Sequence, residues 1–113
     1  MDQPQRRFPR IPATLTVLVT RLRDRPQDSF GRTHTMGGGG CGFITAEPLE
    51  EGAFIEMMIS VRPHAIQATA RVAYQHDRDD GLYEVGVEFL ELSPGDRKLL
   101  DGLLETRLEQ EEA

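Results

Sequence analysis

Residues 66–75 read Ile-Gln-Ala-Thr-Ala-Arg-Val-Ala-Tyr-Gln, the most regular alternation of apolar and polar side chains in the chain. The apolar positions are Ile66, Ala68, Ala70, Val72 and Tyr74, and the polar positions include Gln67, Thr69 and Arg71. Successive side chains of a strand point to opposite faces of a sheet. The pattern therefore predicts a β-strand with one apolar face, on which Tyr74 lies.

Five other segments have a strand pattern, and each is bounded by turn-forming residues. They are residues 14–22, 30–36, 43–45, 53–61 and 83–89. The stretches at 24–29 and 37–42 are expected to be turns or interruptions between strands. The acidic residues 77–81 are expected to connect 66–75 and 83–89 as a hairpin.

A helix is expected after the last strand. Ser93-Pro94-Gly95-Asp96 places a serine at the N-cap, a proline at the first helical position and an acid in the first turn. Leucines then recur at helical spacing at Leu99, Leu100, Leu103, Leu104 and Leu108. This spacing predicts an amphipathic helix of about four turns.

The fold class predicted from these elements is mainly β. Six short strands followed by one capped helix indicate a six-stranded antiparallel β-barrel with a C-terminal α-helix packed against it or closing one end. At 113 residues the chain has the length of one domain. We expect a flexible arm without regular structure over residues 1–12 and the barrel with its helix over residues 13–113.

Charge is distributed unevenly along the chain. The formal net charge is −6, but residues 1–33 hold seven arginines against three aspartates, a balance of +4, which leaves −10 for the rest. A protein that binds duplex nucleic acid along one long face is normally basic overall. The composition therefore argues against a nucleic-acid polymer as partner and favours a compact, local anion site.

Composition also bears on the compartment. No apolar run approaches the roughly 20 residues that span a bilayer, and no apolar segment follows the N-terminal arginines, so we expect neither membrane insertion nor a signal peptide. Cys41 is the single cysteine, so no disulfide framework is possible within the chain. A reducing, cytoplasmic location is expected.

The arginine arm is the strongest candidate for ligand binding. Gln5-Arg6-Arg7-Phe8-Pro9-Arg10 brings three guanidinium groups together within five positions. Each guanidinium can bind a phosphate through a planar fork of donors or stack on a flat ring. The alternative is a solvated basic tail, the commoner fate of charge clusters at termini.

The glycine run at residues 37–42 has two open interpretations. It satisfies G-x-G-x-x-G formally, but a strand follows it instead of a helix, so it does not predict a dinucleotide site. One interpretation is a bulge or wide turn in which glycine takes a positive φ. The other is bare backbone that a ligand can approach closely.

Catalytic and metal-binding patterns are not found in the sequence. His34, His64 and His76 lack metal-ligand spacing and are interpreted as surface or turn residues. Cys41 lies between glycines without a nearby basic pair and is interpreted as a small buried residue. We therefore expect a protein that is not an enzyme and needs neither a metal nor a cofactor.

Taken together, Gln5–Arg10 before a strand, Gly39–Phe43, and Val85-Gly86-Val87-Glu88-Phe89 before the helix resemble a PilZ domain. This is the bacterial receptor family for the second messenger cyclic di-GMP. The resemblance covers the chain from about Gln5 to the helix. It implies a six-stranded barrel with a C-terminal helix, in agreement with the strand pattern.

The resemblance also implies the binding residues. The family motif Arg-Arg-x-x-Arg is matched in full by Arg6, Arg7 and Arg10, and Asp/Asn-x-Ser-x-x-Gly falls on Thr35, Gly37 and Gly40. Of these last three only the final glycine matches, because threonine stands in place of the acid or amide and glycine in place of the serine. The function implied is a cyclic di-GMP receptor or adaptor in motility or biofilm regulation, which signals to an unidentified effector protein. The alternative is a ligand-independent PilZ-like interaction module in motility, pilus or signalling machinery.

Overall fold

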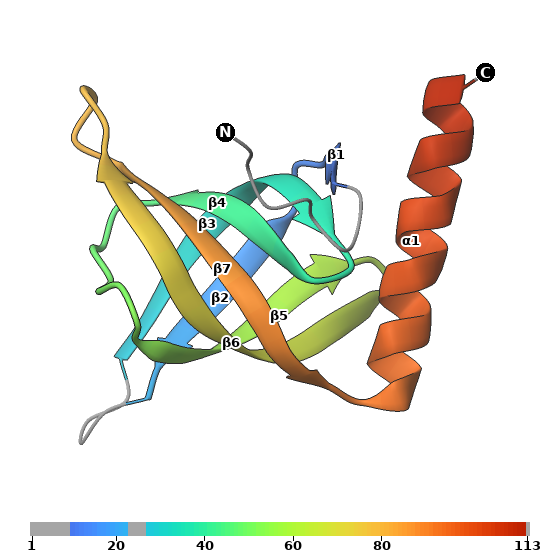
Figure 1. Ribbon diagram of the computed structural model, residues 1–113, viewed down its shortest axis with the longest axis horizontal. Coiled ribbons are helices and arrows are strands. Elements are labelled where there is room, and N and C mark those ends of the chain that lie inside the picture. Colours follow the sequence, from blue (N-terminus) through green and yellow to red (C-terminus); the bar gives the residue numbers. More distant parts are fainter. Residues whose placement is uncertain (1–9, 23–26, 113) are drawn as a thin grey trace, which may run out of the picture.

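In a computed structural model of the chain, seven strands precede one helix (Figure 1). The structure describes residues 10–22 and 27–112, with side chains up to residue 106. The elements are β1 (Arg10–Pro12), β2 (Thr16–Arg21), β3 (Gln27–Gly37), β4 (Gly40–Thr45), β5 (Phe54–Val61), β6 (His64–Asp77), β7 (Tyr83–Leu92) and α1 (Pro94–Glu112). All six strands predicted from the sequence are present in β2 to β7.

Six of these strands form a closed antiparallel barrel. The order of hydrogen-bonded neighbours is β3-β2-β5-β6-β7-β4, and pairing of β4 with β3 closes the ring. The seventh strand, β1, pairs with the end of β3 that extends beyond β2. The predicted fold class, a six-stranded barrel with a C-terminal helix, is confirmed.

The strand β1 corrects the prediction that residues 1–12 lack regular structure. Arg10–Pro12 pairs with β3, and Ile11 is only 2% exposed because it packs into the core. Pro12 does not prevent this pairing, because not every residue of an edge strand has to donate a backbone N–H to a neighbouring strand. The rest of the predicted arm, residues 1–9, lies outside the described residues.

The barrel interior is filled by alternate side chains of every strand. Val17 and Val19 of β2, Ile55 and Ile59 of β5 and Phe43 of β4 are all fully buried. The residues between them face outward, as the two-residue period of a strand requires. Burial of these apolar side chains supplies the main driving force for folding.

A bulge in β6 changes which face of the sheet the residues after it occupy. In β6, Val72 pairs with Val87 and Tyr74 with Gly86, so Ala73 is an extra residue without a partner. Val87 faces the core, whereas Tyr74 lies over the outer side of Gly86. The prediction that Tyr74 shares a face with Val72 is therefore wrong, because one inserted residue reverses the alternation beyond it.

The helix α1 begins as predicted. The hydroxyl of Ser93 accepts a hydrogen bond from the backbone N–H of Asp96 at 3.0 Å, which makes serine the N-cap. Leu100 and Leu104 are buried, and α1 packs against β6 and β1 at one end of the barrel (Figure 1). Within the described residues no helix is both long and apolar enough to cross a membrane.

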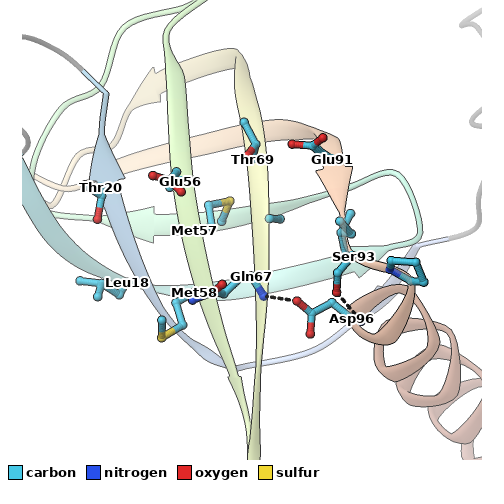
Figure 2. Close-up of a pocket in the computed structure, with 13 residues that line it drawn as sticks. Leu18, Thr20, Glu56, Met57, Met58, Gln67, Thr69, Glu91, Ser93 and Asp96 are labelled. Atoms are coloured by element: carbon cyan, nitrogen blue, oxygen red, sulfur yellow. Dashed lines mark hydrogen bonds between the residues drawn. The ribbon is translucent and has the colours of Figure 1, made fainter.

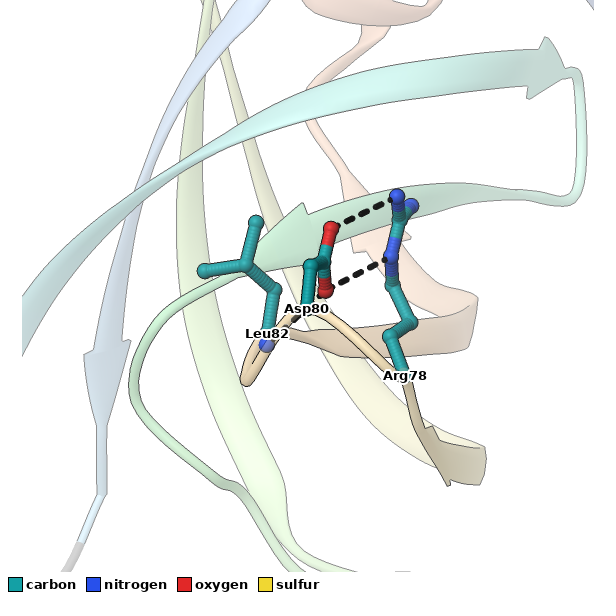
Figure 3. A network of polar contacts seen from close by, with 3 residues as sticks. All are labelled: Arg78, Asp80 and Leu82. Carbon is teal, nitrogen blue, oxygen red and sulfur yellow. Dashed lines mark hydrogen bonds and ion pairs between the residues drawn. The ribbon is translucent and has the colours of Figure 1, made fainter.

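The predicted hairpin between β6 and β7 is present and is stabilised by Asp80. Its carboxylate accepts hydrogen bonds from the Leu82 N–H at 3.1 Å and from the Arg78 guanidinium at 2.9 and 3.3 Å (Figure 3). The backbone hydrogen bond from Leu82, assisted by Arg78, lowers the pKa of Asp80. Gly81 takes a φ of 82°, which a side chain would disfavour at this turn.

Cys41 is predicted to be unreactive in the folded protein. Burial raises the pKa of its thiol to about 12, with Arg10 opposing the shift. Ellman's reagent at pH 8 should therefore label almost no thiol in native protein and one thiol per chain in urea. Because the folded pKa lies above the unfolded value, this thiol should favour unfolding only above about pH 9. Full labelling of the native protein would contradict the buried position.

Candidate functional site

The pairing of β1 with β3 places Arg10, the last residue of the arginine motif, beside the second motif. Arg10 lies directly opposite Gly37, and Pro12 lies directly opposite Thr35. Between them, Ile11 pairs with Met36, and both side chains are buried in the core. Directly opposed residues share a face of the sheet, so the other two pairs lie on the outer face of the barrel.

A buried threonine holds the segment between β1 and β2 against β3. The hydroxyl of Thr33 donates to the Ala13 carbonyl at 2.6 Å and accepts from the Leu15 N–H at 2.8 Å. The Thr33 N–H donates to the Leu15 carbonyl at 2.9 Å, and the Ala13 N–H donates to the His34 carbonyl at 3.2 Å. These bonds set the register of β1 and hence the position of Arg10.

A bulge in β3 places two polar side chains side by side. Thr33 pairs with Phe43 and Thr35 with Gly42, so His34 is the extra residue. His34 and Thr35 both lie beside Gly42, where a Cβ would be 2.9 Å from the imidazole Nε2 and 3.0 Å from the threonine Oγ1. The same imidazole nitrogen is 3.9 Å from a carboxylate oxygen of Glu84.

These two atoms have unused hydrogen-bonding capacity. Within the described part of the chain, His34 Nε2 and Thr35 Oγ1 are buried and have no hydrogen-bond partner. Leaving a buried polar atom without a partner costs about 1–3 kcal/mol. Such atoms mark a place where a ligand with donors or acceptors would recover that cost.

Side chains lie over two paired glycines on this surface. Gly42 pairs with Gly86, and Gly86 pairs in turn with Tyr74. A Cβ on Gly86 would lie 2.0 Å from the tyrosine ring, so that ring rests directly on the glycine backbone. The ring of His76 lies 5.0 Å from that of Tyr74. The main chain of Gly42 and Gly86 is thus covered by the side chains of His34, Thr35 and Tyr74.

Steric need, and not positive φ, explains the glycines here. Within the described residues only Gly52 and Gly81 have positive φ, so the interpretation in which glycines of the run at 37–42 take this conformation is wrong. Gly40 instead lies so close to β7 that a Cβ would be 2.1 Å from the Val87 carbonyl oxygen. The glycine lets two strands approach where the barrel closes.

The turn between β3 and β4 is attached to the helix. The guanidinium of Arg97 in α1 donates to the carbonyl of Gly38 at 2.7 Å, and the Phe89 N–H of β7 donates to the carbonyl of Gly39 at 2.8 Å. The turn is therefore held from two sides, which fixes the backbone next to Gly37 and Gly40.

The acidic charge nearest to Gly40 is neutralised. Gly40 pairs with Glu88, whose carboxylate accepts from the guanidinium of Arg71 at 2.9 Å. The two side chains are each 49% exposed, so this ion pair adds little to stability. Its effect on the site is electrostatic, because a paired carboxylate repels an approaching anion less than a free one.

The structure brings together part of the predicted site. Arg10, Thr35, Gly37 and Gly40 lie at or beside the junction of β1, β3 and β4. Arg6 and Arg7 lie outside the described residues. Sequence reasoning missed His34, Tyr74, Gly42 and Gly86, because the bulges that place the two rings on this surface leave no mark on the alternation of residues.

The described residues contain no group of three or more histidine, cysteine, aspartate or glutamate side chains that could hold a metal ion. His64 and His76 are exposed, as expected, and His34 is half-buried. The surface presents two polar atoms without hydrogen-bond partners, the rings of Tyr74 and His76, and Arg10.

Comparison with known proteins gives one family. The sequence profile described as PilZ domain matches residues 4–106. No curated protein matches the sequence.

Solved structures of PilZ proteins have the same fold. The inhibitor of motility MotI/DgrA of Bacillus subtilis has 17% identity and a TM-score of 0.77 over 96% of this chain and 52% of its own. The PilZ domain of YcgR from Escherichia coli, solved with c-di-GMP, has 18% identity and a TM-score of 0.72 over 95% of this chain and 94% of its own. The K. pneumonia MrkH–c-di-GMP complex has 17% identity and a TM-score of 0.77 over 97% of this chain and 56% of its own. The chain thus spans about half the length of MotI and MrkH.

Two glycine-to-alanine substitutions should have opposite effects on stability. One glycine is required by a close contact between strands, and the other only weakens a helix. Gly40→Ala should lower the free energy of unfolding by about 1–3 kcal/mol, because its Cβ meets the Val87 carbonyl. Gly102→Ala, in α1 with no atom near the added Cβ, should raise it by about 0.5–1 kcal/mol. Urea denaturation followed by circular dichroism measures both. A Gly40→Ala variant as stable as the wild type would contradict the close strand approach.

Proposed function

Because this chain belongs to the PilZ domain family, we propose that it is a receptor for cyclic di-GMP that binds the messenger on the outer face of β1, β3 and β4. The observation that carries the proposal is the pairing of Arg10 with Gly37. This pair joins the end of the arginine motif to the middle of the second motif. One ligand can then contact both.

The chemistry of the surface suits the two parts of the ligand. Cyclic di-GMP has two phosphates and two guanine bases. Arg10, with Arg6 and Arg7 ahead of it in sequence, would supply guanidinium donors for phosphate or stack on guanine. The rings of Tyr74 and His34 cover the main chain of Gly86 and Gly42, so a planar base would stack on these side chains and not on bare backbone.

Two polar atoms would assist recognition of the base. Guanine presents N–H donors and ring acceptors at its edge. Thr35 Oγ1 and the neighbouring His34 Nε2, neither of which has a hydrogen-bond partner in the described part of the chain, would exchange hydrogen bonds with such an edge. We propose that His34 offsets part of what is lost by having threonine in place of an acid or amide.

The expected affinity is lower than that of a receptor with the full second motif. A hydroxyl is a neutral acceptor, and Gly37 offers only main chain. Each lost hydrogen bond costs about 0.5–1.5 kcal/mol, and each 1.4 kcal/mol is about a tenfold change in affinity. Two losses therefore weaken binding without abolishing it.

The second candidate is a ligand-independent interaction module. The replacement of both polar residues of the second motif, at Thr35 and Gly37, favours it. Calorimetric titration of the purified chain with cyclic di-GMP distinguishes the two candidates. Saturable binding supports the receptor, and no heat or melting-temperature shift at high ligand concentration supports the interaction module.

Removal of the arginines should weaken binding. Arg6→Ala, Arg7→Ala and Arg10→Ala should each reduce the affinity for cyclic di-GMP, and rising salt should reduce it in the wild type. Arg78→Ala is the matched control, because this arginine pairs with Asp80 in the β6–β7 hairpin. A triple alanine variant that binds as tightly as the wild type would refute the role of the arm.

Restoration of the second motif should strengthen binding. Thr35 and Gly37 flank the buried Met36, so both face outward, and Gly37 does not have the positive φ that would exclude a side chain. Thr35→Asp with Gly37→Ser should tighten binding of cyclic di-GMP by roughly 1–3 kcal/mol. Calorimetry of the wild type, both single variants and the double variant, with a melting curve for each, measures the gain. A folded double variant with unchanged affinity would show that these positions do not face the ligand.

A further inference from the structure

An apolar row crosses the outside of the barrel away from the candidate site. Phe30 of β3 lies directly opposite Leu18 of β2, which lies directly opposite Met58 of β5. Phe30 is 69% exposed and Met58 is 39% exposed. We call these three residues the apolar row.

The outward position of this row is fixed by the core. Leu18 stands between Val17 and Val19, and both of these valines are fully buried. Directly opposed side chains lie about 5 Å apart, so the row is continuous over three strands. Single exposed apolar residues need no explanation, but an aligned group of them on a sheet is characteristic of an interaction surface.

An acidic row runs parallel to the apolar row. Asp28 lies opposite Thr20, Thr20 opposite Glu56, Glu56 opposite Thr69, and Thr69 opposite Glu91. We call Asp28, Glu56 and Glu91 the acidic row. Figure 2 shows Thr20, Glu56, Thr69 and Glu91 lined up beside Leu18, Met58 and Gln67.

The carboxylates of this row are available to a partner. Asp28 accepts a hydrogen bond from the Thr20 hydroxyl at 2.7 Å. The carboxylates of Glu56 and Glu91 form no hydrogen bond or ion pair with any residue that the structure describes. On the other side of the apolar row lies Arg32, opposite Thr16. The charges that flank the apolar row therefore differ in sign: they are negative on the side of the acidic row and positive on the side of Arg32.

A groove connects the two rows with the start of the helix. It has a volume of about 550 Å³ and extends from Leu18 and Met58 past Gln67 to Ser93 and Asp96 (Figure 2). Its lining residues come from β2, β5, β6, the end of β7 and the start of α1, and none of them belongs to the candidate ligand surface. The groove is therefore a separate surface.

We propose that this face docks a basic amphipathic segment of a partner protein. Apolar side chains of the segment pack on Phe30, Leu18 and Met58, while lysine or arginine side chains pair with Glu56 and Glu91. Charge complementarity selects this occupant. A second copy in the same orientation would bring acidic rows together, and nucleic acid or an anionic membrane would be repelled. The proposal does not depend on cyclic di-GMP.

A synthetic amphipathic peptide of leucine and lysine, labelled with fluorescein, is a suitable probe. Fluorescence anisotropy without cyclic di-GMP should show binding of this peptide and no binding of a leucine–glutamate peptide of the same pattern. Glu56→Lys with Glu91→Lys should weaken binding about tenfold or more. Phe30→Ser with Met58→Ser should have a similar effect. Amide shifts in NMR spectra should concentrate on β2, β5 and the start of α1.

Two control variants test whether peptide binding depends on this face or only on the net charge and the exposed apolar area of the protein. Glu47→Lys with Glu51→Lys makes the same change of net charge in the exposed segment between β4 and β5. Leu22→Ser removes an exposed apolar side chain, 44% accessible, beyond the end of β2. Neither should change the affinity. No binding of the basic peptide, equal losses in test and control variants, or sedimentation showing a dimer that Phe30→Ser dissociates would each overturn the proposal.

Discussion

The pairing of β3 with β4 is the constraint on which the rest of the structure depends. It closes a six-stranded sheet into a barrel, so that no barrel strand is left with an open edge. On its other side β4 pairs with β7, and there Gly40 lies close to the carbonyl of Val87. The pairing of β3 with β4 also contains the bulge at His34, and this bulge turns two consecutive polar side chains outward. The candidate ligand surface is thus a consequence of how the barrel closes.

Sequence patterns predicted the elements well because burial and turn chemistry are local signals. Three such patterns are the alternation in β6, the capping serine of α1 and the leucines on the buried side of the helix. Each has a local physical cause that can be recognised in the sequence. Alternation fails at a bulge, however, because one inserted residue leaves the composition unchanged and reverses every side chain beyond it. Tyr74 is the example: its apolar neighbours predict an inward ring, and its actual position depends on Ala73 having no partner in β7.

The candidate site was also predicted only in part, because some of its features depend on local sequence and others on tertiary contacts. The spacing of Thr35 and Gly37 correctly placed both on one face, since Met36 between them is buried. A three-residue strand such as β1 has no periodicity of its own, so its pairing with β3 could not be read from the sequence. That pairing depends on Ile11 filling the core beside Met36 and on Thr33 bonding the chain that follows. These are tertiary contacts, and they determine where Arg10 lies.

The first turn of α1 contacts both the groove and the turn beside the candidate ligand surface. Asp96 accepts a hydrogen bond from the Gln67 N–H at 3.2 Å and forms one wall of the docking groove. The next residue, Arg97, donates to the carbonyl of Gly38 in the turn that precedes Gly40. Communication between two sites requires an element with two arrangements that each ligand distinguishes. Among the described residues, the first turn of α1 bonds both to β6 beside the groove and to the turn that precedes Gly40, so the start of the helix fixes the position of both.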